Sequence, residues 1–334
     1  MSTLKADPIE WLMSEDSDNP SVRYFALTDL LGAPLDSPEV VHAKQAIMKS
    51  GPVPQILEAQ TDEGWWAKAG PGYSPKYRGT VWQVIFLAEL GADGGDERVQ
   101  RGVGYLLDHS IADNRAFSVY YDSRKSGTLH CLNGNLLWAL IRLGWFEDPR
   151  VQAALAWQCR AIIGDDSVEY LRSGTCGPGF ACGVNGGLPC AWGANKAMRA
   201  LLEVPIGDRG PAGEAAIETA VSLLLSRDPA VADYPNASKV STAWFRFGFP
   251  LSYWSDVLET VALLARAGQG QWPELSAAIA MILDKQDADG RWKMRNSLTG
   301  KMWSDIEARG KASKWVTLRA LRALKHLGLY ATTG

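Results

Sequence analysis

A repeated pair of helical segments is the feature of this sequence that most restricts its fold. In each repeat an apolar helical run ends at or near Leu-Gly, a short turn follows, and a second helical run begins. The first runs are apolar around most of their circumference, whereas the second runs carry charge on one face. A helix that is apolar all round is buried and an amphipathic helix faces solvent. The first runs are therefore predicted to form an inner layer, and they cover residues 21–32, 80–91, 134–144, 193–204, 255–268 and 315–328.

Small residues and acidic residues mark the ends of these runs. Five first runs end in a glycine where a left-handed C-cap residue belongs, namely Gly32, Gly91, Gly144, Gly268 and Gly328. The second runs after two of them begin with Asp96 and Asp148, which are typical N-cap residues. We find no strand-like alternation of useful length. The chain is therefore predicted to be all-α.

The loop lengths predict how the two layers are connected. Turns from an inner to an outer run are short, which makes each pair antiparallel. The returns from an outer to the next inner run are long, and they cover about 61–76, 110–130, 164–189, 228–250 and 286–312. All inner helices then run in the same direction, with the long loops at one end. We predict an (α/α)6 barrel, or toroid, made of one domain over 1–334, with 1–19 as an N-terminal extension or cap.

Composition excludes several classes of protein. A chain of 334 residues that is 46% hydrophobic can bury a large core, and its net charge of −3 argues against a nucleic-acid-binding protein. We find no stretch of eighteen apolar residues and no signal peptide, so we expect no stable membrane anchor and a cytoplasmic location. The five cysteines are expected to be reduced thiols. The oligomeric state stays open.

Two corners of the chain share one motif. QTDEGWW at 60–66 and QDADGRW at 286–292 each contain Gln, an acidic turn, Gly and Trp. This motif resembles the Gln-Trp repeat of squalene–hopene cyclases and of protein prenyltransferase β-subunits, the terpenoid cyclase and prenyltransferase superfamily. The resemblance extends along nearly the whole chain and implies the same barrel, with an isoprenoid-binding interior. The corners themselves are expected to be structural, since a Trp needs an apolar wall and a partner for its N–H.

The sequence departs from this superfamily where chemistry is concerned. It has neither the Asp-x-Asp-Asp acid motif of class II cyclases nor the Asp-x-Cys pair that binds zinc in prenyltransferases. Neither activity can therefore be carried over. What the resemblance still implies is a pocket for a small-molecule substrate.

The loop end of the barrel holds the candidate site residues, because the first turns of the inner helices meet there. The catalytic candidates are His130, Cys131, Asp256, Cys176 and Cys182. The candidates for substrate binding are Tyr77, Arg78, Trp82, Asn135, Cys190, Trp192, Tyr253, Trp254, Lys314 and Trp315. His42, His109 and His326 fall at outer or terminal helix positions and are expected to face solvent.

Each of these candidates has a simpler structural explanation. Cys131 beside His130 fits a nucleophile and base, but a small buried Cys is a common packing residue. Asp256 fits a general acid or base, and equally an N-cap of its own helix. Zinc on Cys176, Cys182, Cys190 and His130 is weakly supported, because the spacings match no recognised zinc motif. The aromatic residues either line a pocket or fill the barrel.

Three functions remain open. The first is an enzyme that acts by acid–base chemistry on a small, largely apolar, isoprenoid-like molecule, as a lyase, isomerase or cyclase. The second is a hydrolase of glycosidic or ester bonds, with Asp256 and one of Asp122, Asp305 or Glu307 as paired carboxylates. The third is a toroid that binds a small molecule or a protein without catalysis. A loop end plugged by side chains would argue against the first.

Overall fold

Six parallel helices form the inner ring of the molecule. The computed structural model describes residues 4–120, 127–165, 168, 176–271 and 273–331. The inner helices are α2 (Pro20–Phe25), α5 (Thr80–Glu89), α7 (His130–Arg142), α9 (Ala191–Leu201), α11 (Val257–Leu264) and α13 (Lys314–His326). A turn of π-helix extends two of them, over Ala26–Leu30 after α2 and Ala265–Gln269 after α11.

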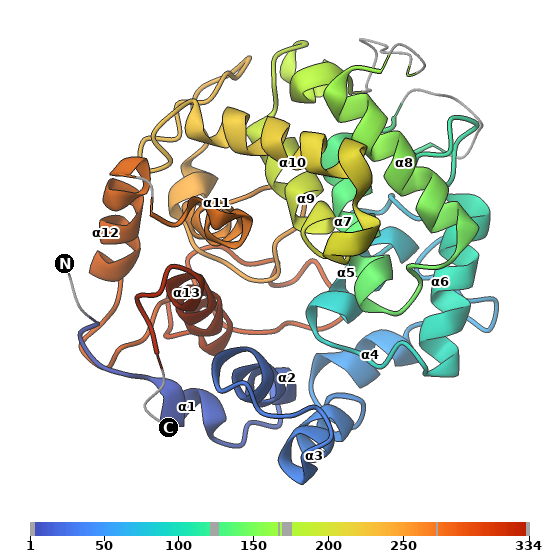
Figure 1. Cartoon of the computed structure of the whole chain (residues 1–334). Helices are drawn as coiled ribbons and strands as arrows, with labels where there is room; N and C mark the ends of the chain where they lie inside the picture. The colour runs from blue at the N-terminus through green and yellow to red at the C-terminus, as the bar shows by residue number, and fades with distance from the viewer. Residues whose placement is uncertain (1–3, 121–126, 166–167, 169–175, 272, 332–334) are drawn as a thin grey trace.

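An outer ring surrounds these helices (Figure 1). It contains α3 (Pro38–Ile47), α4 (Pro52–Glu58), α6 (Glu97–His109), α8 (Pro149–Ile163), α10 (Gly210–Leu225) and α12 (Ser276–Asp284). Helix α1 (Ile9–Met13) packs on α2 and α13, so the N-terminal segment covers α13. The described residues form isolated β-bridges but no strand, and the predicted all-α (α/α)6 barrel is confirmed.

The predicted helix boundaries are observed. All five C-cap glycines have a positive φ, between 67° at Gly32 and 85° at Gly144. Asp96 and Asp148 cap α6 and α8 by accepting hydrogen bonds from the backbone N–H of Arg98 and Arg150. Buried residues run all round the inner helices: nine of the ten residues of α5 are buried. Outer helices bury only one face, as the charge pattern predicts.

The two Gln-Trp corners are built by the same hydrogen bonds. The indole N–H groups of Trp66 and Trp292 each donate at 2.7 Å to a carbonyl ten residues upstream, those of Ile56 and Ile282. The two backbone N–H groups donate to threonine hydroxyls on the next inner helix. Both indole rings are fully buried.

The glutamines complete each corner. Gln60 binds the Gly64 carbonyl within its own corner and the Arg98 carbonyl on the next outer helix, while Gln286 binds the Gly290 and Ala6 carbonyls. Each corner thereby fastens an outer helix, an inner helix and a neighbouring segment together.

No helix in the described ranges is long and apolar enough to cross a membrane.

Candidate functional site

One segment closes the barrel at the loop end. Residues 247–256 lead into α11 and cross the interior of the ring. Phe249 of this segment stacks on Trp315 with ring centroids 3.8 Å apart, and Trp254 makes an edge contact with Tyr77 at 6.3 Å. The mouth that the sequence predicts at this end is therefore filled by aromatic side chains, which argues against the first of the three functions at the place where it was predicted.

Several predicted binding residues meet in this aromatic cluster. The ring centroid of Tyr77 lies 5.0 Å from that of Trp82. The ring centroid of Tyr253 lies 6.2 Å from that of Trp192 and 5.7 Å from that of Trp254. The indole N–H groups of Trp192 and Trp254 are buried and have no hydrogen-bond partner within the described part of the chain. Buried polar groups are nearly always satisfied, so water or a bound molecule is expected beside them.

The other predicted binding residues have structural partners. Asn135 on α7 donates to the Ser252 carbonyl at 3.0 Å and thus holds the crossing segment. The Lys314 ammonium lies 3.2 Å from Asp16, and the Trp315 indole donates to Asn19, so both fasten the N-terminal segment. Arg78 is exposed, with its guanidinium 5.2 Å from the Trp303 ring.

His130 holds three elements together. It is buried, its Nδ1 lies 2.7 Å from the side-chain nitrogen of Gln158 on α8, and its Nε2 lies 2.9 Å from the Gly177 carbonyl. The Gln158 amide donates to Nδ1, so Nε2–H donates to Gly177. Burial lowers the pKa of His130 to about 4. The imidazole is therefore neutral at pH 7, with both nitrogens engaged.

Asp256 caps its own helix and forms an ion pair. Its Oδ1 accepts from the Glu259 backbone N–H at 2.8 Å, and both oxygens bind the Arg319 guanidinium at 2.8 and 2.9 Å. The carboxylate is fully buried. This geometry agrees with the capping interpretation, and it places Asp256 behind an arginine rather than in an open space.

Four cysteines gather between α7 and α9. Cys176 and Cys182 face each other in an antiparallel bridge, and the thiol of Cys190 is hydrogen-bonded to that of Cys182. Burial raises the pKa of Cys131 to about 12, which leaves an unreactive thiol. The described residues contain no group of three or more His, Cys, Asp or Glu side chains arranged to hold a metal ion.

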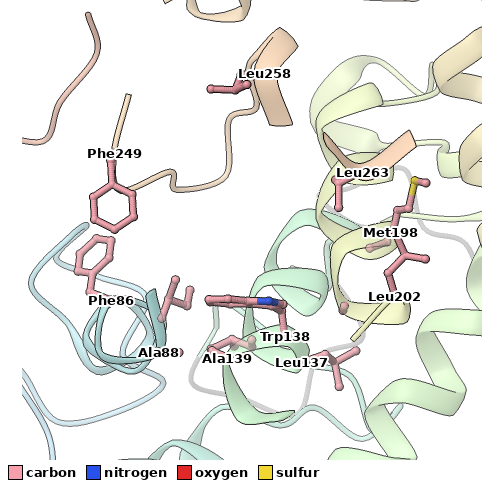
Figure 2. Close-up of a cluster of buried hydrophobic side chains, with 14 of the residues drawn as sticks. Phe86, Ala88, Leu137, Trp138, Ala139, Met198, Leu202, Phe249, Leu258 and Leu263 are labelled. Carbon is pink, nitrogen blue, oxygen red and sulfur yellow. The ribbon is translucent and has the colours of Figure 1, made fainter. Parts of the chain in front are cut away.

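A cavity of about 390 Å³ lies at the opposite end of the barrel, where the inner helices end. Small-molecule sites have volumes of about 300–1,000 Å³. The crossing segment forms part of the cavity wall through Phe249 and Leu251. Further apolar residues on its wall are Trp138, Leu258 and Leu263, and Figure 2 shows these side chains with Phe249 in one buried hydrophobic cluster.

Charged side chains complete the cavity wall. Six cations (Arg142, Arg199, Arg266, Arg319, Arg322 and Lys325) face four carboxylates (Asp29, Glu89, Glu203 and Glu259). With His326 neutral, the lining carries a net charge of +2. Basic residues in the last turns of helices complement the helix dipoles, which accounts for part of this excess.

The positive excess is greatest around Glu203. This carboxylate accepts from Arg142 at 3.1 Å and lies 3.3 Å from Arg266. The Arg199 guanidinium lies 3.4 Å above the Trp138 ring and donates to Glu89 at 2.7 Å. One guanidinium group therefore lies over an apolar ring, and two others share the Glu203 carboxylate on the same cavity wall. Guanidinium is the cation best suited to carboxylates and phosphates.

Glu259 is the carboxylate deepest in this wall. Both of its oxygens lie 2.7 Å from the ammonium of Lys196, which is itself fully buried. Burial alone would raise the pKa of Glu259, but Lys196 and Arg199 outweigh burial and hold the pKa below its usual value. Glu259 is thus an anion at neutral pH and has no proton to donate.

His326, at the end of α13, is a histidine on the same cavity wall. Its pKa is lowered by burial and by the positive charges of Arg266 and Arg322, so the imidazole is neutral at pH 7. The ring forms no hydrogen bond to any residue that the structure describes. The sequence analysis placed His326 in solvent, and the residue is exposed as predicted; it also lies on the cavity wall.

Comparisons with known proteins give a similar chain path at low identity. No family model and no curated protein matches the chain. A protein from Actinoplanes is 17% identical, covering 95% of this chain and 96% of its own, with a TM-score of 0.46. The type II terpene cyclase MstE from Scytonema is 14% identical; the match covers 94% of this chain and 89% of that protein, with a TM-score of 0.46. A polysaccharide lyase is 11% identical; the match covers 93% of this chain and 90% of that protein, with a TM-score of 0.49. Function is therefore inferred from the residues of the site.

Proposed function

We propose that this chain is an enzyme that binds a small, largely apolar molecule with an anionic group in the cavity at the ends of the inner helices, and moves a proton on it. The observation that supports this best is the combination, in one cavity, of an apolar wall and an excess of guanidinium groups. The anionic group binds at Arg142, Arg199 and Arg266, and the apolar part lies against Trp138 and Phe249. An isoprenoid carboxylate has this chemistry.

The proposed reaction is of the lyase or isomerase type. His326 is neutral at pH 7, so it accepts a proton from the carbon next to the bound carboxylate, or from the γ carbon when the substrate is a 2-alkenoate with a vinylic α carbon. The guanidinium groups stabilise the negative charge that develops on the substrate. The proton returns to another carbon in an isomerase, or a leaving group departs in a lyase.

The charge state of Glu259 argues against two reactions that need an acid, cyclisation within the first function and hydrolysis as its alternative. Proton-initiated cyclisation and glycosidic hydrolysis both require a protonated carboxyl group, whereas Glu259 is held as an anion. Of the carboxylates first considered for hydrolysis, Asp122 lies outside the described residues. Glu307 donates no proton to the cavity, because it lies at the loop end and binds Ser313 and the Lys314 N–H.

A deuterium-exchange experiment tests the proposal. Geranate and 3-methylbut-2-enoate are incubated with the protein in D₂O, and mass spectrometry measures deuterium uptake. We expect uptake with the unmodified protein, at least tenfold less with His326→Gln, and none with the matched alcohol geraniol. The control is Arg160→Gln, on the exposed face of α8, which should exchange like the unmodified protein. Equal uptake in His326→Gln would refute His326 as the base.

The loop-end cluster is a second candidate place for the substrate. The unpartnered indole N–H groups of Trp192 and Trp254 favour it, together with the predicted site residues that meet there. A ligand bound there would be lost on Trp254→Phe but kept on Arg142→Gln. The cavity proposal predicts the reverse. If neither variant changes binding of a ligand, that ligand binds at neither place.

A further inference from the structure

The hairpin before α9 presents three thiols on one face. Ala181 and Pro189 pair in an antiparallel bridge, with the Cys182 N–H bonded to the Leu188 carbonyl and the Cys190 N–H to the Phe180 carbonyl. Side chains alternate between the two faces of such a ladder. Cys182 and Cys190 therefore share the face opposite to Ala181 and Pro189, as diagonal neighbours.

Cys176 lies on the same face, directly across from Cys182. Cys182 is thus the central one of three cysteines on this face. The two neighbours differ in exposure, because Cys176 has no exposed surface whereas Cys190 is partly exposed. Cys131 is partly exposed as well, and Cys182 keeps 9% of its surface exposed. A small reagent can therefore reach Cys182 and Cys190 but not Cys176.

We propose that Cys182 and Cys190 form a redox-active dithiol that reacts with a hydroperoxide. Cys182 is the attacking sulfur and Cys190 is the resolving sulfur. The assignment rests on the position of Cys182 between Cys176 and Cys190 on this face, and on the partial exposure of Cys190.

The titration of the four thiols agrees with this assignment. The hydrogen bond from Cys190 lowers the pKa of Cys182 to about 6, so most Cys182 is thiolate at pH 7. Burial raises the pKa of Cys131 to about 12, and it raises that of Cys176 as well. The same shared hydrogen bond raises the pKa of Cys190. Because the thiolate is the nucleophile, Cys182 reacts first.

The reaction balances in two steps. The Cys182 thiolate attacks one oxygen of hydrogen peroxide; an S–O bond forms, the O–O bond breaks, and the departing hydroxide takes a proton to become water. The Cys190 sulfur then attacks the sulfenic sulfur of Cys182; an S–S bond forms, the S–O bond breaks, and the second oxygen leaves as water with the Cys190 proton. Two thiols are oxidised and one peroxide is reduced to two waters.

Oxidation has a structural consequence for α9. The Cys190 sulfur accepts a hydrogen bond from the Gly193 N–H at 3.4 Å and so caps this inner helix. A disulfide to Cys182 turns the Cys190 side chain toward the hairpin and removes that cap. The expected effect is a lower midpoint of thermal unfolding in the oxidised protein than in the reduced protein.

The test is peptide mapping of the whole protein after exposure to hydrogen peroxide at pH 7. Free thiols are blocked by alkylation before digestion. Trypsin leaves Cys176, Cys182 and Cys190 in one peptide, 173–196, so chymotrypsin is added to cut after Phe180 and Trp192 and to separate Cys176 from the other two. A Cys182–Cys190 disulfide then appears as the loss of two hydrogens within peptide 181–192. We expect a Cys182–Cys190 disulfide and a fall in free thiols from five to three.

Three variants decide the assignment, each checked for native helix content by circular dichroism. Cys190→Ser should accumulate sulfenic acid on Cys182, which dimedone traps. Cys182→Ser should react with peroxide at least tenfold more slowly. Cys176→Ser is the matched control and should form the disulfide at the normal rate. A Cys176–Cys182 disulfide, or equal peroxide consumption by Cys182→Ser and the unmodified protein, would overturn the proposal.

Discussion

The buried pair of Lys196 and Glu259 allows a quantitative test of the charged interior. The ammonium lies 2.7 Å from both carboxylate oxygens, and the side chains are 0% and 7% exposed. Removing one partner of such a pair costs about 3–5 kcal/mol, because the other charge is left buried and unpaired. Glu259→Gln keeps the shape of the side chain and removes only its charge. We therefore expect this variant to lose about 3–5 kcal/mol of stability.

The expected shift in melting temperature follows from chain length. An unfolding entropy of about 2.1 cal/mol/K per residue gives about 0.7 kcal/mol/K for 334 residues. A loss of 3–5 kcal/mol then lowers the midpoint of thermal unfolding by about 4–7 °C. Scanning calorimetry measures this shift, and Arg160→Gln on the exposed face of α8 is the control for removing a charge.

A double variant separates the cost of an unpaired charge from the value of the pair. Lys196→Met with Glu259→Leu replaces both groups by apolar side chains of similar size, which is often neutral or stabilising. We expect the double variant to unfold within about 2 °C of the unmodified protein. The reasoning is refuted if Glu259→Gln melts within about 1 °C of the unmodified protein, or if the double variant is less stable than Glu259→Gln.

Three further predictions concern other parts of the molecule. His130 has a pKa of about 4 in the folded protein and about 6.5 in the unfolded chain. Its contribution of about 3 kcal/mol to the free energy of unfolding is therefore present above pH 6.5 and lost as the pH falls to 4. Urea unfolding of His130→Asn should show a weaker pH dependence of stability in this range. Trp66→Phe and Trp292→Phe remove equivalent indole hydrogen bonds. Each should lower the free energy of unfolding in urea by about 1–3 kcal/mol. Losses that differ by more than about 2 kcal/mol would contradict the equivalence of the two corners. Alkylation of Cys182 by iodoacetamide should be half-maximal near pH 6, and a midpoint above pH 8 would contradict the thiolate assignment.

The barrel could be predicted from the sequence because its signals are local. Helix periodicity, the N-caps at Asp96 and Asp148 and the C-cap glycines each depend on a few neighbouring residues, and their order along the chain fixes the pairing of helices. The Gln-Trp corners at Trp66 and Trp292 added the family resemblance. Each of these features is present in the structure.

The position of the cavity could not be predicted in the same way. Whether the loop end is open depends on how residues 247–256 cross the ring, and no periodic pattern describes a crossing loop. The sequence does show Phe249, Tyr253 and Trp254 in this segment, but it does not show which inner helices they contact. Those side chains fill the loop end, so the cavity lies at the other end of the inner helices.

The charged wall was missed for a related reason. Arg142, Arg199 and Arg266 stand in the last turns of inner helices, where basic residues commonly complement the helix dipole. Each is unremarkable when considered alone. Only the parallel arrangement of the six inner helices brings these last turns to one cavity. His326 closes the last helix and is exposed as predicted, and the same position places it on the cavity wall.

The most direct test of the central claim is a crystal structure of the protein soaked with geranate. We predict that the carboxylate lies within hydrogen-bonding distance of Arg142, Arg199 or Arg266, with the chain of the ligand along Trp138 and Phe249. Geranate bound instead between Trp192 and Trp254 at the loop end, or absent from the cavity at a concentration that saturates binding in solution, would contradict the account.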